Sequence, residues 1–248
     1  MNIISASYGN DSMALIRWAY ETKLPDVTVV YCDTGWSAPG WLDRVAQCEQ
    51  IAKDYGFKTD RTESMGFEEL ARMKKGFPGT GPTQWCTAWL KGLPFLDWVQ
   101  KRDPDKKAVV LIGKRRAESK SRAQTPEYID ESEYHGGRRV WHPLYLHSND
   151  ERDKLVRRAG LEVLPHRSQE CSPCVYANRT DLMLLTQDQI ERVNDLEVEI
   201  GKPMFRPKRF GAVGIYGVMV WAKHGRKRGG LLDPIEDEGC GAPFGCRL

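Results

Sequence analysis

The first sixteen residues constrain the fold more than any other part of the sequence. An apolar run at Ile3–Ile4 leads into small and polar residues, and apolar residues return at helical spacing from Met13. This order is typical of a β-strand, a tight loop and the start of a helix. Backbone N–H groups at a helix start lack partners within the helix and attract anions such as phosphate. The stretch therefore predicts a phosphate site, although an ordinary capped helix after an edge strand would show the same pattern.

The residue types in this loop suit an anion. Ser7 and Ser12 offer hydroxyl donors, and Gly9 lets the backbone approach a ligand closely. Residues 7–12 resemble the pyrophosphate-binding loop of the ATP-pyrophosphatase superfamily, whose pattern is Ser-Gly-Gly-x-Asp-Ser. The loop reads Ser7, Tyr8, Gly9, Asn10, Asp11 and Ser12, so a tyrosine stands in place of the first glycine.

Length and composition indicate a globular protein. A chain of 248 residues, 40% of them hydrophobic, suits a large α/β domain with a smaller C-terminal addition. No apolar run is long enough to cross a bilayer and no signal-peptide layout is visible, so we expect a cytoplasmic protein without a membrane partner. The net charge is only +3, but basic residues cluster at 114–116, 138–139, 157–158, 208–209 and 226–228. Such clusters favour a phosphate-bearing or nucleic-acid partner.

Alternating strand and helix patterns predict a central parallel sheet. Strands are expected at 27–32, 57–59, 108–112 and 140–145, and helices at 13–22, around 42–48, at 67–73 and at 149–159. An amphipathic helical region follows at 180–200, with a further helical patch near 213–221. We expect a nucleotide-binding α/β domain over residues 1–165 and a helical, metal-binding region over residues 166–248.

Polar residues follow two of these strands, where ligands of open α/β sheets collect. After the strand at 27–32, Asp33 is a candidate to bind ribose, adenine or Mg²⁺, although it could also serve only in a turn. After the strand at 108–112 comes a basic run in which arginines can grip phosphate and Glu118 can order them. A solvated basic loop is the alternative for this run.

Three further stretches resemble the phosphoadenylylsulfate (PAPS) reductase family. Residues 113–122 look like its Gly-x-Arg-x-x-Glu-Ser-x-x-Arg motif, and residues 86–94 are similar to its Cys-Thr-x-x-x-Lys-x-x-Pro segment. Cys171 and Cys174 form a Cys-x-x-Cys element like that of the family. The resemblance runs from Ile3 to about Arg179 in the family's order. It implies a Rossmann-like, adenine nucleotide alpha hydrolase fold with ATP or an adenylyl nucleotide across the carboxyl ends of the strands.

The resemblance also implies roles for particular residues. The catalytic candidates are Asp11, Ser12 and Arg116. The cofactor-binding candidates are Ser7, Tyr8, Gly9, Asn10, Asp33, Thr34, Gly35, Gly113, Arg115, Glu118 and Arg122.

Seven cysteines favour metal or redox chemistry over structural disulfides. Cys32 and Cys48 lie in apolar patterns and are expected to be buried small hydrophobes. The metal-ligand candidates are Cys86, Cys171, Cys174, Cys240 and Cys246. The last four would form a closed tetrahedral zinc site. For a [4Fe–4S] cluster, which we favour, the resemblance brings Cys86 together with the Cys-x-x-Cys pair and one tail cysteine.

Three functions remain open from the sequence. The first is an ATP pyrophosphatase that uses Mg²⁺ to adenylate an acceptor for sulfur incorporation, as in nucleic-acid thiolation or DNA phosphorothioation. Its expected partners are ATP, a nucleic acid and a cysteine desulfurase or other sulfur donor. The second is a thioredoxin-dependent PAPS or adenylylsulfate reductase, and the third is a non-catalytic nucleotide-binding module. The complete Asp11–Ser12 ending of the loop favours ATP over a sulfonucleotide.

Overall fold

The computed structural model describes residues 1–79, 83–119, 122–205 and 213–224. At its centre lies a six-stranded sheet with the strand order β3-β2-β1-β4-β6-β5. The strands are β1 (Asn2–Ala6), β2 (Val27–Asp33), β3 (Lys58–Glu63), β4 (Val109–Leu111), β5 (Tyr128–Ser132) and β6 (Arg138–Trp141). All neighbours pair in parallel except β5, which runs antiparallel to β6 at the edge. The expected α/β class with a central parallel sheet is therefore confirmed.

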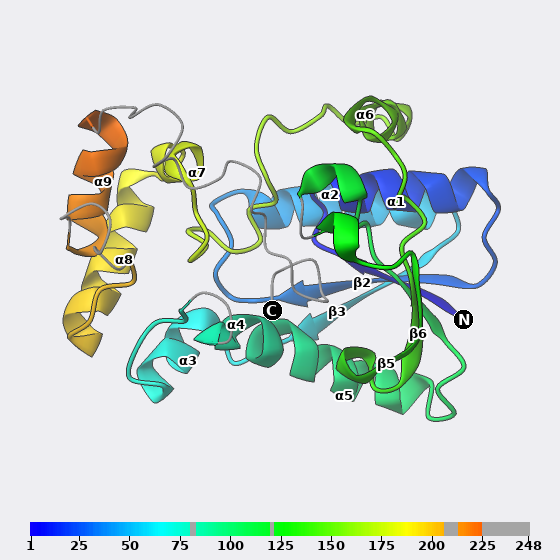
Figure 1. Cartoon of the computed structure of the whole chain (residues 1–248), viewed down its shortest axis with the longest axis horizontal. Helices are drawn as coiled ribbons and strands as arrows, with labels where there is room; N and C mark the ends of the chain where they lie inside the picture. Colours follow the sequence, from blue (N-terminus) through cyan, green and yellow to red (C-terminus); the bar gives the residue numbers. More distant parts are fainter. Residues whose placement is uncertain (80–82, 120–121, 206–212, 225–248) are drawn as a thin grey trace.

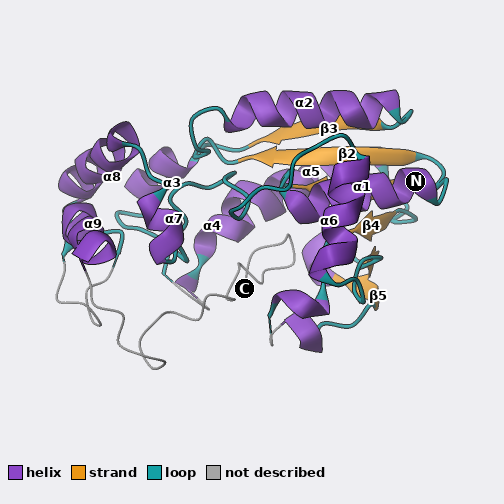
Figure 2. Ribbon diagram, turned by 90° about the horizontal axis from the view of Figure 1, so that it is seen from above, coloured by secondary structure: helices purple, strands orange, loops and turns teal. Residues whose placement is uncertain are grey.

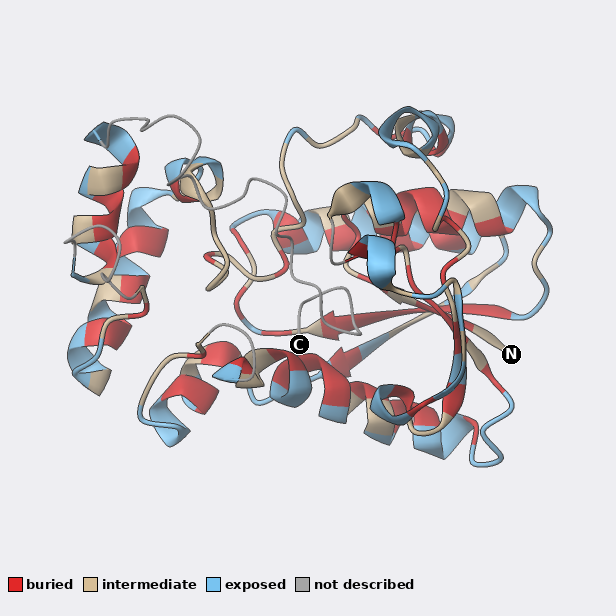
Figure 3. Cartoon of the chain, viewed as in Figure 1, coloured by how far each residue is buried: buried red, intermediate tan, exposed pale blue. Residues whose placement is uncertain are grey.

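Helices cover both faces of the sheet (Figure 1). One face carries α1 (Asn10–Glu21), α2 (Trp41–Asp54) and α6 (Asn149–Arg158), and the other carries α5 (Leu93–Arg102). The alternation of side chains along β1 builds both layers, because Ile4 packs in the cluster with α1 while Ile3 packs in the cluster with α5. Figure 3 shows the resulting core as a buried sheet between helices with exposed outer faces.

Two elements near the edge strand differ from expectation. The strand β5 was not predicted, because the sequence Tyr-Ile-Asp-Glu-Ser at 128–132 is mostly exposed and has no apolar run. The strand expected at 140–145 is β6, which begins and ends earlier, at Arg138 and Trp141. A proline at 143, which has no N–H to donate to a ladder, follows two residues after its end.

A second group of helices packs beside the carboxyl end of the sheet (Figure 2). It comprises α3 (Phe67–Met73), α4 (Trp85–Thr87), the π-helical turn η2 (Ala88–Gly92), α7 (Arg179–Met183), α8 (Gln187–Ile200) and α9 (Gly214–His224). The helical region expected at 180–200 is thus two helices, since Thr186 caps α8 by accepting a hydrogen bond from the Gln189 N–H. Leu184 lies in the break and is exposed.

The apolar core of this helical group contains residues from early and late parts of the chain. Trp36, Phe67 and Leu90 pack there with residues of α8 and α9. The domain boundary after residue 165 stays a prediction, since this core draws on both sides of it. Among the described helices, none is long and apolar enough to cross a membrane.

Candidate functional site

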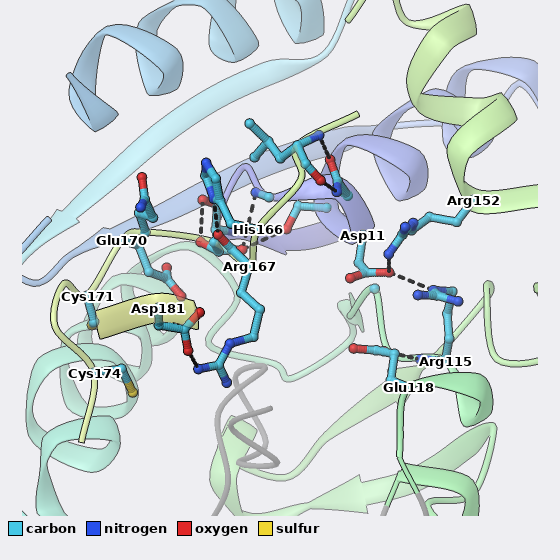
Figure 4. A pocket seen from close by; sticks show the side chains of 18 of the residues that line it. Asp11, Arg115, Glu118, Arg152, His166, Arg167, Glu170, Cys171, Cys174 and Asp181 are labelled. Atoms are coloured by element: carbon cyan, nitrogen blue, oxygen red, sulfur yellow. Dashed lines mark hydrogen bonds and ion pairs between the residues drawn. The ribbon is translucent and has the colours of Figure 1, made fainter. Parts of the chain in front are cut away.

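A cavity of about 510 Å³ opens where β1 and β4 end. Its walls come from the loop after β1, from the basic run after β4, from α6 and from the segment around the Cys-x-x-Cys pair, so the cavity joins these parts of the chain. Figure 4 shows Asp11, Arg115 and Glu118 on one side of it and Cys171, Cys174 and Asp181 on the other. A volume of this size is in the range of small-molecule and cofactor sites.

The loop after β1 forms the floor of the cavity. The Ser7 N–H donates to the Ser12 hydroxyl at 3.0 Å, and the two serine hydroxyl oxygens lie 3.2 Å apart. Gly9 is the N-cap of α1 and has no side chain to accept hydrogen bonds from the first-turn N–H groups. Those groups therefore remain for an anion. A Cβ at Gly9 would lie 3.0 Å from the Ser168 Cβ, so a glycine also lets these two segments meet.

Tyr8, the residue in place of the first glycine, does not enter the cavity. Its φ of 58° lies in the left-handed region, and its side chain is fully buried against Tyr31 with ring centres 5.8 Å apart. Burial raises the pKa of Tyr8 far above its ordinary value. The backbone at Tyr8 thus adopts the left-handed conformation that glycine favours. The Tyr8 ring packs in the apolar core beneath α1 and α2.

Among the residues that the structure describes, the buried Tyr8 hydroxyl has no hydrogen-bond partner. Because a buried polar group without a partner costs about 1–3 kcal/mol, we expect Tyr8→Phe to keep or raise the free energy of unfolding. Urea unfolding measures this change, and nucleotide affinity should stay within twofold of the parent protein. A large loss of nucleotide affinity in a folded Tyr8→Phe protein would contradict the assignment of Tyr8 to the core.

The basic run after β4 is tied to the loop through charged side chains. Arg115 is 1% exposed, and its Nε donates to Asp11 Oδ1 at 2.6 Å. Its guanidinium also donates to Asn149 Oδ1 at 3.0 Å, and its backbone N–H donates to Glu118 Oε1 at 2.7 Å. Glu118 in turn forms an ion pair with Arg122. Burial, and next the Asp11 carboxylate, raises the pKa of Glu118.

Close backbone packing brings the two segments together. A Cβ at Gly113 would lie 2.8 Å from the Asp11 carbonyl oxygen, which explains a glycine directly after β4. The network Asp11–Arg115–Asn149 then links α1, the basic run and α6. Such pre-arranged charge suits the binding of a phosphorylated ligand.

The structure brings together many of the residues predicted from sequence. Those that line the cavity are Ser7, Gly9, Asn10, Asp11, Ser12, Gly113, Arg115, Glu118, Arg122, Cys171 and Cys174. Those that do not line it are Tyr8, Asp33, Thr34, Gly35, Arg116 and Cys86. Asp33 Oδ1 accepts a hydrogen bond from the Gly35 N–H at 2.9 Å, as in a turn, and Arg116 is exposed.

Several lining residues were not singled out from the sequence. Arg152 lies in the early part of α6, with an Nη1 4.0 Å from Asp11 Oδ1. A cation near a helix N-terminus interacts unfavourably with the helix dipole. This unusual placement is the feature of the sequence that could have marked Arg152 as a site residue. The segment 164–170 carries no motif. It is held by Asn10, whose side-chain amide donates to the Leu164 carbonyl and accepts from the Leu164 N–H, both at 2.9 Å.

Cys86, Cys171 and Cys174 border a second, small cavity of about 30 Å³. The Cys174 Sγ accepts a hydrogen bond from the Tyr176 N–H at 3.5 Å. Beside them, the buried Lys91 Nζ lies 2.5 Å from Glu170 Oε1. Cys32 and Cys48 are buried, as expected. Cys240 and Cys246 lie outside the described residues.

The three thiols border a common space but do not surround a single ion. Within the described ranges, no three His, Cys, Asp or Glu side chains are close enough to hold one metal ion together. The donors at this place are soft thiol sulfurs, which suit zinc or an iron–sulfur cluster rather than a hard cation such as Mg²⁺. A cluster is several atoms across, so its ligands lie farther apart than those of a single zinc ion.

The fold and the cavity define a nucleotide-binding α/β protein. The phosphoadenosine phosphosulfate reductase domain matches residues 1–174. The chain therefore belongs to the PAPS reductase family, which confirms the resemblance seen in its motifs and supports a role in nucleotide-related sulfur metabolism.

Two similar proteins accompany this match. An uncharacterised 37.8 kDa protein of Escherichia phage 186 is 25% identical over an alignment of 232 residues, and the match covers 73% of this chain and 69% of the phage protein. The phosphoadenylyl-sulfate (PAPS) reductase from Candida auris, solved as a phosphate complex, is 16% identical. That comparison covers 65% of this chain and 74% of the reductase, with a TM-score of 0.43.

Proposed function

We propose that the protein is an ATP pyrophosphatase that adenylates an acceptor so that sulfur can be incorporated. The observation that carries the proposal is the placement of Ser7, Asp11 and Ser12 on the floor of the cavity, next to the uncapped first turn of α1. This is the arrangement expected for a pyrophosphate group. Arg115 and Arg122 line the same cavity, where each is paired with a carboxylate, Arg115 with Asp11 and Arg122 with Glu118.

In the proposed reaction, an acceptor oxygen attacks the α-phosphorus of ATP. The bond from the α-phosphorus to the oxygen bridging it to the β-phosphorus breaks, and pyrophosphate leaves with that electron pair. A hydrosulfide ion then displaces AMP from the activated acceptor. If a cysteine desulfurase is the donor, it supplies the sulfur as a persulfide, which a thiol reductant converts to hydrosulfide while a disulfide forms. Mg²⁺ would lie near Asp11 and offset charge on the departing pyrophosphate. The clustering of basic residues in the sequence favours a nucleic acid as the acceptor. Of these residues, Arg157 and Arg158 are exposed, whereas Lys114, Arg115 and Arg138 are buried.

A sulfonucleotide reductase is the second candidate. The same cavity reaches from the phosphate loop to Cys171 and Cys174, and the family match carries the reductase name. In that reaction a cysteine thiolate attacks the sulfonyl sulfur, the nucleotide leaves, and thioredoxin dithiol reduces the resulting thiosulfonate to release sulfite. For this candidate the attacking thiol would be a cysteine of the tail, and Cys240 lies outside the described residues.

A paired assay separates the two candidates. Anaerobically purified protein is incubated with Mg-ATP and nucleic acid, and separately with PAPS or adenylylsulfate plus thioredoxin. Release of pyrophosphate in the first reaction supports the ATP pyrophosphatase. Sulfite in the second reaction without pyrophosphate in the first supports the reductase. Neither product would overturn both and leave a nucleotide-binding module.

The cysteine segment is proposed to hold a [4Fe–4S] cluster through Cys86, Cys171, Cys174 and one of the two tail cysteines. We expect anaerobically purified protein to absorb in the visible range and to contain iron and acid-labile sulfide. Cys171→Ala should lose this absorbance because the cluster loses a thiolate ligand. Cys48→Ala, which removes a thiol buried in the core under α2, is the matched control and should keep it. A colourless protein that contains zinc would contradict the cluster and support the zinc alternative.

A further inference from the structure

Lys114 is a buried cation in the wall of the nucleotide cavity. It is 7% exposed and follows directly after Gly113. The arginines near it are neutralised, Arg115 by Asp11 and Arg122 by Glu118. Among the described residues, Lys114 has no recorded ion pair or side-chain hydrogen bond. Lys114 therefore differs from the two arginines, whose charges are already paired.

The backbone holds Lys114 beside the phosphate loop. Its N–H donates to the Ile112 carbonyl at 2.8 Å, which makes a tight turn at Gly113. Gly113 itself packs against the Asp11 backbone. Lys114 therefore stands on a short, restrained connection between β4 and the basic run, at the loop end of the cavity.

The surroundings of Lys114 are poor in negative charge. The charged and titratable groups that act on it or feel its charge are Arg122, Glu118, His135 and His142. Burial, and next the Arg122 charge, lowers the pKa of Lys114 to about 8, while Glu118 acts in the opposite direction. Burial also lowers the pKa of His135 to about 3 and that of His142 to about 4, so both are neutral at pH 7. A buried amine in such surroundings weakens the fold, which is typical of a residue retained for binding.

We propose that Lys114 binds the second tetrahedral oxyanion of an adenine nucleotide, the group attached to the 5′-phosphate. In ATP this group is the β-phosphate, and in a sulfonucleotide it is the sulfuryl group. The inference rests on the proposed nucleotide site. It adds the contact through which the protein would bind ATP or a sulfonucleotide more tightly than AMP. The ligand would supply the negative charge that the surrounding protein does not.

The experiment compares the parent protein with Lys114→Met and Lys114→Arg by calorimetric titration. The ligands are AMP, a non-hydrolysable ATP analogue and adenylylsulfate. Because the substitution removes a charged hydrogen-bond donor, we expect Lys114→Met to bind the analogue or adenylylsulfate about tenfold or more weakly. AMP affinity should change less than twofold, and Lys114→Arg should keep most of the affinity.

Two further readouts separate binding from a structural role. Lys114→Met should melt at the same temperature as the parent or higher, because it removes a buried charge. The affinity of the parent protein should fall as pH rises from 7 to 9.5, since the amine loses its proton while the ligand phosphates stay ionised. The affinity of Lys114→Arg should be flat over this range. Lys107→Met is the matched control, because Lys107 lies before β4 and is exposed and paired with Asp105 at 3.1 Å.

The same titrations show which oxyanion Lys114 binds and whether Lys114 binds one at all. A loss confined to the ATP analogue assigns the phosphoryl group, and a loss confined to adenylylsulfate assigns the sulfuryl group. Unchanged affinities in Lys114→Met, with a parent protein that binds these nucleotides, overturn this inference alone. A parent protein that binds none of them overturns the proposed function as well.

Discussion

Asp11→Ala is expected to lower ATP-dependent pyrophosphate release by about 100-fold or more, the size of effect seen when a preorganised transition-state contact is removed. Asp11 lies in the first turn of α1 and lines the cavity. Its carboxylate also fixes the buried Arg115 through a 2.6 Å contact. The substitution therefore removes a contact of the proposed metal–nucleotide complex and leaves the buried Arg115 without the carboxylate that fixes its position.

The matched control for this change is Asp43→Ala. Asp43 also lies in the first turn of a helix that follows a strand, but it is exposed and does not line the cavity. Its replacement should leave pyrophosphate release within twofold of the parent rate. Full activity in a correctly folded Asp11→Ala protein would contradict the proposed site.

Arg115→Met is expected to lower both the free energy of unfolding and the affinity for nucleotide. Breaking a buried ion pair by removing one partner costs about 3–5 kcal/mol, because the remaining charge loses its partner. Asp11 keeps some contact with solvent, with its side chain 29% exposed, so we expect a loss near the lower end of that range. Urea unfolding at neutral pH measures this loss, and calorimetric titration of an ATP analogue measures the accompanying loss of affinity.

The neighbouring arginine provides the comparison. Arg116 is exposed and lies outside the cavity, so Arg116→Met should change the free energy of unfolding by no more than about 0.5 kcal/mol. Nucleotide affinity should also be kept. Equal effects of the two substitutions would mean that the basic run acts only through its net charge. A larger loss of nucleotide affinity in Arg116→Met than in Arg115→Met would support the catalytic role that the motif implies for Arg116.

The parts of the fold predicted from sequence are those with strong local patterns. The strands β1, β2 and β4 are apolar runs buried on both sides, and α3 occupies residues 67–73 as predicted. The edge strand β5 was not predicted because its residues are mostly exposed and carry no apolar signal. The division between α7 and α8 depends on a single capping threonine, which a periodic pattern does not register.

The candidate site was predictable where motif and strand end coincide. The loop at 7–12 and the run at 113–122 follow adjacent parallel strands, so their convergence follows from the fold. Whether the side chains of Tyr8 and Arg116 face the core, the cavity or solvent depends on the direction of the backbone after each strand. Residue types alone do not determine that direction. The contact of Asn10 with Leu164 holds the lining segment 164–170 in place. These two residues are far apart in the sequence, so no local sequence pattern predicts their contact.

A crystal structure with bound non-hydrolysable ATP tests the central claim most directly. We predict that the phosphates lie within hydrogen-bond distance of the N–H groups of residues 9–12, with Arg115 and Arg122 on the same side. Nucleotide bound elsewhere, or a cavity that stays empty while the nucleotide saturates the protein in solution, would contradict the account.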